Sequence, residues 1–209
     1  MTTSATLERQ RLASLMLELG PDAPTRCDGW TARDLAAHIV LRERRPDAAV
    51  GVVFGRFAGR TAAVQAKIAD GDWKELVAKL RNGPPIWSPT RIGAIDRAFN
   101  TLEFFVHHED LRRATEQWRP RELDDDLADD LDAALRRGAR LLARRARCGV
   151  TLEPDAGRAR ITARDADPTV IVRGPLGELV LWMFGRDADV EFDGPDDAVE
   201  ALRAARLGV

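Results

Sequence analysis

Residues Asn100–Ala114, NTLEFFVHHEDLRRA, are the segment that most restricts the fold of this chain. Apolar residues lie on nearly every side of a helix built from it, which is typical of a buried helix. Glu103 and His107 are four positions apart, so a helix places them on one face, one turn apart. A buried carboxylate requires a partner, and a metal ion can be that partner. The segment therefore predicts a buried helix that carries a charged site.

All three histidines of the chain lie in two short helical segments. His107 and His108 belong to the segment above, and His38 ends the stretch WTARDLAAH. Helix bundles use a histidine of one helix and Glu-x-x-x-His of another to build metal sites. His38, Glu103 and His107 would leave a coordination position open, which suits catalytic zinc, with nickel, iron or manganese as alternatives. The competing interpretation is that Glu103 and His107 pair without any metal.

Residues next to these candidate ligands have several interpretations. His108 is turned by about 100° from His107, so it either supports the ligands, lines the pocket and binds a cofactor there, or is a surface residue. Asp110 comes three positions after His107 and can orient its imidazole through a hydrogen bond, or it can pair with a neighbouring arginine. Cys27 precedes the second helix, and a lone cysteine is usually a small hydrophobic residue. We therefore leave Cys27 out of the predicted ligand set.

The first part of the chain has the apolar spacing of helices. Thr31 and Asp34 have the spacing of a capping box, which predicts the start of the second helix. A later segment has acidic residues first and arginines last, which matches a helix dipole. That helix is either solvated or provides a basic patch for an anion. We expect helices over residues 6–19, 31–45, 61–80 with a break at Gly71, 92–115 and about 122–147.

After Gly149 the pattern changes to short β-branched or alternating runs, which predict strands. The runs are GVTLEP, RARITARD, PTVIVRG and ADVEFDG. A helix between Pro175 and Gly185 separates the last two strands, and another helix ends the chain. We therefore expect an α+β protein: a helical domain over residues 1–146 and a small α/β domain with an antiparallel sheet over residues 147–209.

Charge and hydropathy exclude several classes of protein. The formal net charge is −2, so no overall basic field indicates binding to nucleic acid. No apolar run has the length of a membrane span, and MTTSATLERQR lacks the apolar core of a signal peptide. We therefore expect a cytoplasmic protein with two reduced cysteines, which does not bind membranes. Its positive charge is carried mostly by arginine, as in GC-rich and for instance actinobacterial genomes.

Three stretches together resemble one known family. TRCDGWTARDLAAHIV and LEFFVHHEDLRRA resemble the metal-binding part of the mycothiol-dependent maleylpyruvate isomerase family, which belongs to the DinB-like superfamily of four-helix bundles. GELVLWMFGR is similar to the C-terminal domain of that family, a small sterol-carrier-like α/β unit. The resemblance spans nearly the whole chain, and it is strongest for an uncharacterised actinobacterial branch with the run HHED.

The resemblance implies specific roles for residues of this chain. His38, Glu103 and His107 match the family's metal ligands, and the metal is typically zinc. Arg186 matches a functional arginine that would bind a substrate carboxylate, although it can equally be a charge at a helix C-terminus. Mycothiol would be the thiol cosubstrate.

Two functions follow as hypotheses. In the first, a metal-bound thiolate attacks a small electrophile, as in an isomerase or an S-transferase. The partners are then this electrophile and a low-molecular-weight thiol. In the second, the chain is a non-catalytic metal-binding or regulatory protein. Fold alone does not decide between them.

Overall fold

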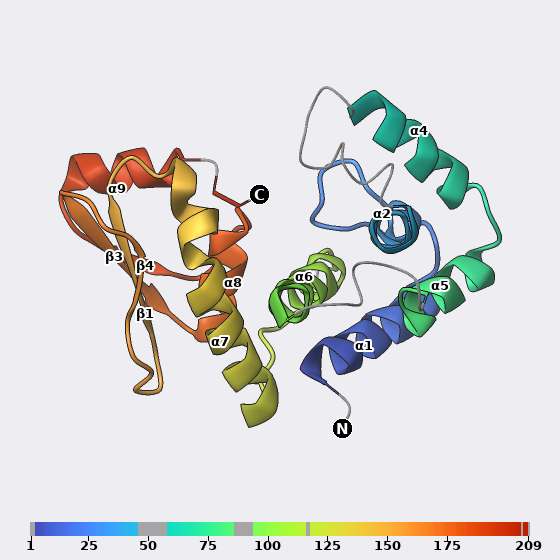
Figure 1. The fold of residues 1–209 in the computed structure, drawn as a ribbon, viewed down its shortest axis with the longest axis horizontal. Helices are drawn as coiled ribbons and strands as arrows, with labels where there is room; N and C mark the ends of the chain where they lie inside the picture. The colour runs from blue at the N-terminus through green and yellow to red at the C-terminus, as the bar shows by residue number, and fades with distance from the viewer. Residues whose placement is uncertain (1–2, 46–57, 86–93, 116–117, 206, 209) are drawn as a thin grey trace. The chain divides into compact units, whose positions relative to one another are not determined.

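The computed structural model describes residues 3–45, 58–85, 94–115, 118–205 and 207–208, and it is an α+β structure (Figure 1). Contacts divide the chain into two compact units, Met1–Arg121 and Glu122–Val209. We call them unit 1 and unit 2. The division falls one helix before the boundary that we expected at residue 146, because the helix after Glu122 packs with the sheet of unit 2.

In the described part of the chain, unit 1 consists of helices. They are α1 (Ser4–Leu19), α2 (Ala32–Arg44), α4 (Ala58–Ala69), α5 (Trp73–Asn82) and α6 (Ala94–Arg112). Helix α1 packs against α6 and α5, and α2 packs against α4 and α5. The predicted start of the central helix at residue 92 lies outside the described residues.

Helix starts and breaks of unit 1 follow from side chains that the sequence shows. Thr31 and Asp34 form the predicted capping box at the start of α2, each accepting from the other's backbone N–H. The helix expected over residues 61–80 is interrupted at Gly71, between α4 and α5. Asp72 caps α5 by accepting from the N–H of Glu75 at 2.9 Å. The predicted capping box and the predicted break are both confirmed.

A buried arginine connects three helices of unit 1. Arg9 of α1 forms a two-pronged ion pair with Glu43 of α2, and its Nη1 donates to the carbonyl of Leu80 in α5 at 2.8 Å. Its guanidinium also lies 4.2 Å from the ring centroid of Phe104 in α6. Breaking one side of such a pair leaves an uncompensated buried charge, so the pair restricts how these helices can pack.

Unit 2 is a four-stranded sheet with helices. Its strands are β1 (Gly149–Pro154), β2 (Ile161–Arg164), β3 (Thr169–Gly174) and β4 (Glu191–Asp193), in the order β2-β1-β3-β4. Its helices are α7 (Asp125–Leu142), which continues into the short 3₁₀ helix Ala143–Arg145, α8 (Leu176–Met183) and α9 (Asp196–Arg203). Figure 1 shows α7 and α8 on the same side of the sheet. The four predicted strands and the two helices predicted after residue 174 are all present.

The predicted antiparallel sheet is wrong in one pairing. Strands β1 and β2 form an antiparallel hairpin, but β3 then pairs with the other edge of β1 and runs parallel to it. Gly149 permits the close approach of the chain before β3, because a Cβ there would overlap the carbonyl oxygen of Ala166. Period-two patterns locate strands but do not say which neighbour each one pairs with.

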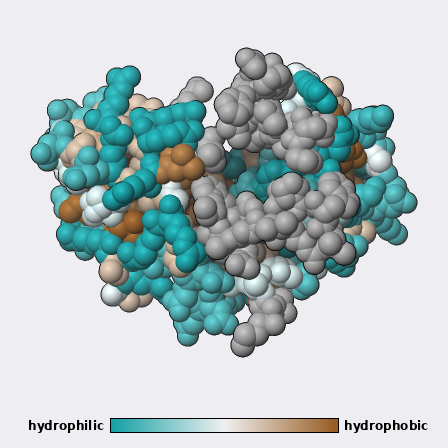
Figure 2. Space-filling view, viewed as in Figure 1, coloured by the Kyte–Doolittle hydropathy of each residue, from teal (hydrophilic) through white to brown (hydrophobic). Residues whose placement is uncertain are grey.

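Among the described residues in Figure 2, hydrophilic ones cover most of the visible surface, and hydrophobic ones occupy small, separate areas. None of the helices in the described ranges combines the length and hydropathy needed to cross a bilayer.

Candidate functional site

A loop before α2 is fixed to the C-terminal end of α6. The backbone N–H of Arg26 donates to the carbonyl of Asp110 at 2.9 Å, and its Nε donates to the carbonyl of Arg113 at 2.8 Å. Within the loop, the hydroxyl of Thr25 accepts from the N–H of Cys27 at 3.1 Å. These bonds satisfy carbonyls that have no partner at a helix end, and they bring Cys27 to α6.

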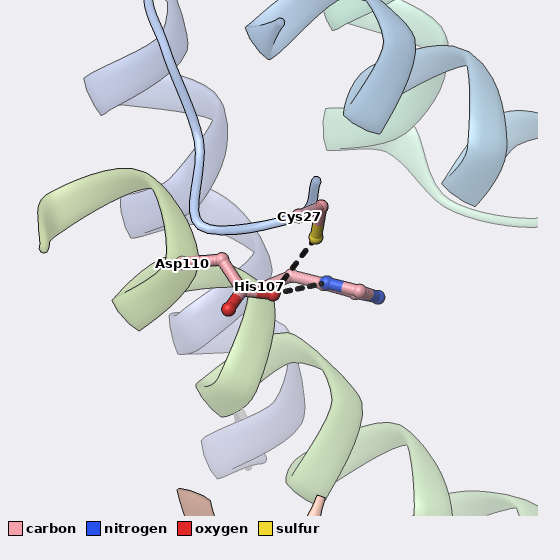
Figure 3. Close-up of side chains that lie close together, drawn as sticks. All are labelled: Cys27, His107 and Asp110. Carbon is pink, nitrogen blue, oxygen red and sulfur yellow. Dashed lines mark hydrogen bonds and ion pairs between the residues drawn. The ribbon is translucent and has the colours of Figure 1, made fainter. Parts of the chain in front are cut away.

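Cys27, His107 and Asp110 form a cluster (Figure 3). The Asp110 carboxylate is 1 % exposed, and its Oδ2 lies 3.1 Å from Nδ1 of His107 and 3.2 Å from Sγ of Cys27. Among the described residues, these three form the group whose ligand atoms all lie within 4.8 Å of one another. They are a candidate metal site, because thiolate, imidazole and carboxylate are all zinc ligands.

The ring of His38 lies close to the ring of His107. The centroids of the two imidazoles are 5.8 Å apart, and the rings meet edge to face at 75°. Trp30 packs against His38 with a centroid distance of 5.0 Å. Two of the three predicted metal ligands, on α2 and α6, are thus close together.

The protonation state of His38 suits a ligand. Burial, the largest cause, lowers the pKa of His38 from 6.5 to about 3, and positive charge on His107 and Arg42 acts in the same direction. A hydrogen bond with Gln65 opposes this change. The imidazole is therefore neutral at pH 7, and neutral imidazole is the form that binds metals.

The third predicted ligand, Glu103, has a protein cation beside it. Its carboxylate forms an ion pair with Arg42, which is one helical turn after His38 on α2. Arg42 also donates from Nη2 to Oδ1 of Asn100 at 3.1 Å. Arg42 would therefore compete with a metal for the carboxylate of Glu103. The set His38, Glu103 and His107 therefore stays a prediction.

His108 lies in a separate, closed network on another side of α6. It is 6 % exposed, so the alternative of a surface residue is wrong. Its Nδ1 lies 2.9 Å from Oε2 of Glu8 in α1, and the guanidinium of Arg121 reaches both oxygens of Glu8. Its predicted role as a cofactor-binding group is untested, and these contacts favour a structural role.

The network continues through Glu109, which is 1 % exposed. Its Oε1 accepts from Arg112 at 2.7 Å and from Arg121 at 2.9 Å, and its Oε2 accepts from Arg113 at 2.8 Å. The arginines after Asp110 thus pair with Glu109, and Asp110 orients His107. The hydrogen bond that we predicted between Asp110 and His107 is confirmed.

Charge compensation in this network is strong. Burial by itself raises the pKa of Glu8, but hydrogen bonds from His108 and Arg121 and their positive charge outweigh it and lower the pKa from 4.5 to about 2. Burial also raises the pKa of Glu109, but the neighbouring arginines lower it by more, so the net change is downward. The hydrogen bond from Arg113 makes the largest of these lowering contributions.

Arg186, the predicted catalytic residue, belongs to unit 2. Its backbone N–H donates to the carbonyl of Leu181 at 3.0 Å, and the N–H of Gly185, at φ 73°, donates to the carbonyl of Trp182 at 2.8 Å. This pattern is a Schellman motif, which ends α8. The side chain of Arg186 donates from Nη1 to the carbonyl of Phe184 at 3.0 Å. This contact is the helix C-terminal role that we gave as the alternative, and the catalytic role stays a prediction.

No protein-family model and no curated protein matches this chain. Two crystal structures of a mycothiol-dependent maleylpyruvate isomerase do match its structure, one of the enzyme and one of a histidine-to-alanine mutant. The TM-scores are 0.58 and 0.57, with 16 % and 17 % sequence identity respectively. Each match covers 91 % of this chain and 90 % of that chain.

The chain therefore has the fold of this isomerase. The structural matches confirm the resemblance seen in the sequence motifs, as a resemblance in fold. Sequence identity this low shows the fold alone, so the roles of single residues must be argued from the site itself.

Sequence reasoning missed two participants of the site. Cys27 was set aside as a small hydrophobic residue, but the loop bonds of Arg26 bring its thiol to Asp110. Arg42 follows His38 by one turn of α2, but this spacing does not indicate its contact with Glu103 of α6. No local signal indicates the contact of Arg121 with Glu8, since the two residues are 113 positions apart.

Proposed function

We propose that this chain is a metal-dependent enzyme that uses a low-molecular-weight thiol to attack a small electrophile. The observation that carries the proposal is the contact between the rings of His38 and His107, in a fold shared with a mycothiol-dependent enzyme. His38, His107 and Glu103 would hold the metal, most suitably zinc. Mycothiol is the thiol that the structural neighbour's name suggests.

The Asp110 carboxylate defines how His107 would act. A carboxylate only accepts hydrogen bonds, so Nδ1 of His107 carries the proton and donates it to Asp110. The lone pair of the ring is then on Nε2, the nitrogen that Figure 3 shows at the end of the ring away from Asp110. A carboxylate in this position fixes the tautomer of a metal-binding histidine and raises its basicity.

Arg42 and Glu103 would exchange partners when a metal binds. Arg42 now balances the charge of Glu103, and its guanidinium would be released toward the same site once Glu103 binds the metal. A guanidinium there suits an anionic substrate group or thiolate, because it donates hydrogen bonds in a planar fork. The bound metal would supply one property, a thiol held as thiolate near neutral pH.

A second candidate function rests on the cluster of Cys27, His107 and Asp110. Their ligand atoms are already within 4.8 Å of one another, and Asp110 is almost completely buried. A metal at this cluster would bind the loop of Cys27 to α6 and would serve stability or sensing. This is the non-catalytic alternative.

Conversion of a small electrophile tests the proposed activity. The protein, zinc and mycothiol are incubated with a panel of small electrophiles, and the remaining thiol and the remaining electrophile are both measured over time. An S-transferase would consume both, whereas an isomerase would convert the electrophile and release the thiol again. We expect conversion above background with at least part of the panel and its loss in His107→Ala, and background rates of conversion with every electrophile in the zinc-loaded protein would contradict the enzyme proposal.

The two metal sites are separated by Cys27→Ser. With cobalt in place of zinc, a thiolate ligand gives a sulfur-to-metal charge-transfer band in the near ultraviolet. The enzyme proposal expects no such band before thiol is added and unchanged metal affinity in Cys27→Ser. A band that is present in the free protein and absent in Cys27→Ser would favour the non-catalytic site.

A further inference from the structure

Helix α7 has acidic residues at one end and arginines at the other, on one exposed side. Ala133 lies near the middle of the helix, and the positions three, four and seven before and after it share its side. The apolar residues of α7 are buried on the other side. Together with Ala133, the exposed residues at these positions form what we call the α7 face: Asp126, Asp129, Asp130, Arg136, Arg137 and Arg140.

Only part of the charge on the α7 face is compensated within the chain. Asp129 pairs with Arg158 at 2.8 Å, and Arg136 pairs with Asp132 at 2.7 Å. These pairs are exposed, and the side chain of Asp129 is 75 % exposed, so such contacts exchange easily. Within the described residues, ion pairs and side-chain hydrogen bonds are absent for Asp130, Arg137 and Arg140.

The charges of the α7 face are arranged symmetrically about Ala133. Opposite charges lie equally far before and after it: Asp130 and Arg136 at three positions, Asp129 and Arg137 at four, Asp126 and Arg140 at seven. When two copies of the helix cross antiparallel about a two-fold axis at Ala133, each position meets its counterpart on the partner. Every acid of the face then meets an arginine. The small side chain of Ala133 at the crossing point lets the two helices approach closely.

Other partners match the α7 face less well. A parallel pair of α7 helices would place acid against acid and arginine against arginine, which is unfavourable. A polyanion would be attracted by the arginine half and repelled by the acidic half. A second, antiparallel copy complements both halves at once.

We propose that the α7 face binds a second copy of this chain, with the two α7 helices antiparallel and Ala133 at the two-fold axis. Exposed ion pairs each contribute little, and one helix face forms a small interface, so this dimer is weak and depends on salt. The inference depends only on residues of unit 2 and goes beyond the proposed metal and thiol chemistry.

Analytical ultracentrifugation of the full chain, without added metal or thiol, measures the association over a series of protein concentrations. We expect a dimer that grows with concentration at an ionic strength of about 0.01 M and dissociates at about 1 M. Over this range the Debye length falls from about 30 Å to about 3 Å, so exposed charges cease to attract one another across the interface.

Two double variants test the antiparallel pairing. One combines Asp126→Arg with Asp129→Arg, and the other combines Arg137→Glu with Arg140→Glu. A dimer of either variant with itself would bring like charges together, so we expect its dimerisation constant to weaken at least about tenfold. In an equimolar mixture the two variants again have opposite charges at every matched position. We expect the mixture to associate as the wild type does, which also shows that both variants are folded.

Asp197→Arg combined with Glu200→Arg is the matched control. These two acids are exposed on α9, with the same spacing and the same distance from the start of their helix as Asp126 and Asp129 on α7. The change in net charge is also the same. We expect this control to dimerise as the wild type does.

Several results would overturn the proposal. They are a wild type that stays monomeric at low ionic strength, reversal variants that dimerise by themselves as well as the wild type, a mixture that does not associate, and a control that dissociates as the reversal variants do. Heparin tests the other class of partner: if it binds a wild type that does not self-associate, the arginines of α7 serve an anionic partner instead. Failure of the thiol assay, by contrast, would leave the association unchanged.

Discussion

Two adjacent histidines of α6 lie in different environments. His107 contacts a thiol-bearing loop through Asp110 and meets a neutral imidazole, His38, on α2. His108 contacts Glu8 of α1 in a network that Arg121 and Glu109 extend. A thiol, an imidazole and one carboxylate lie around the first histidine, whereas several ion pairs compensate one another around the second.

The difference separates a binding site from a structural network. Thiol, imidazole and a hydrogen-bonded carboxylate are groups that a metal can bind without first breaking a charge network. Removing any member of the His108 network would leave buried charge without compensation. We therefore propose that the His107 side of α6 binds a metal and that the His108 side stabilises the fold. The predictions below test this division.

The largest effect is expected for Glu8→Gln. This change removes the carboxylate that accepts from His108 and Arg121, while leaving the donors in place. Breaking one side of a buried ion network costs about 3–5 kcal/mol of unfolding free energy. Urea denaturation measures it, and Glu18→Gln on the exposed side of α1 is the control. If Glu8→Gln lowers the unfolding free energy no more than Glu18→Gln does, the network does not stabilise the fold.

Acid should remove the same stabilisation. Because the folded-state pKa of Glu8 is about 2 and the ordinary value is 4.5, its stabilisation is complete above pH 4.5 and is lost as the pH falls toward 2. The contribution is about 3 kcal/mol, from the size of this pKa change. Unfolding free energies measured across this pH range should fall less steeply in Glu8→Gln. Identical slopes in the two proteins would contradict the assigned pKa.

Asp110→Asn tests the His107 side. The change keeps the shape of the side chain but removes the charge that orients His107 and accepts from Cys27. Loss of such an orienting carboxylate weakens metal affinity by about 10–100-fold. Competition with a chromophoric chelator measures the affinity of the folded protein. Glu109→Asn, on the His108 side, should lower stability with little change in affinity for zinc. The reverse pattern would contradict the division of α6.

The smallest effect is expected for Cys27→Ser. The serine hydroxyl can still donate to Asp110, so we expect zinc affinity to change by less than about threefold, within the context dependence of one retained hydrogen bond. A loss comparable to that of His107→Ala would instead place Cys27 among the ligands. The same chelator competition decides between these outcomes.

Local patterns predicted most of the elements. The capping box of Thr31 and Asp34, the break at Gly71 and the four strand runs are all visible in short windows of sequence. The parallel pairing of β1 with β3 was missed, because it depends on which edge of β1 is chosen after the hairpin closes. The placement of α7 with the sheet was missed as well, since its helical pattern resembles that of the preceding helices.

For the site, spacing along α6 predicted the Asp110–His107 bond, because residues three apart share a helix face. Spacing could not reveal Arg42 as the partner of Glu103 or Glu8 as the partner of His108. Both contacts join helices far apart in the sequence, and they depend on how those helices rotate and cross. Contacts within one helix can thus be predicted from the sequence of that helix, whereas contacts between helices can be identified only from the three-dimensional structure.

Zinc binding by three proteins tests the central claim most directly: the untagged wild type, His107→Ala and His108→Gln. Each is treated with a chelator, titrated with zinc and analysed by plasma mass spectrometry after gel filtration. We predict that the wild type and His108→Gln each retain a single zinc ion per folded chain and that His107→Ala retains none. Absence of zinc in the titrated wild type, or equal loss in both variants, would contradict a metal site on the His107 side of α6.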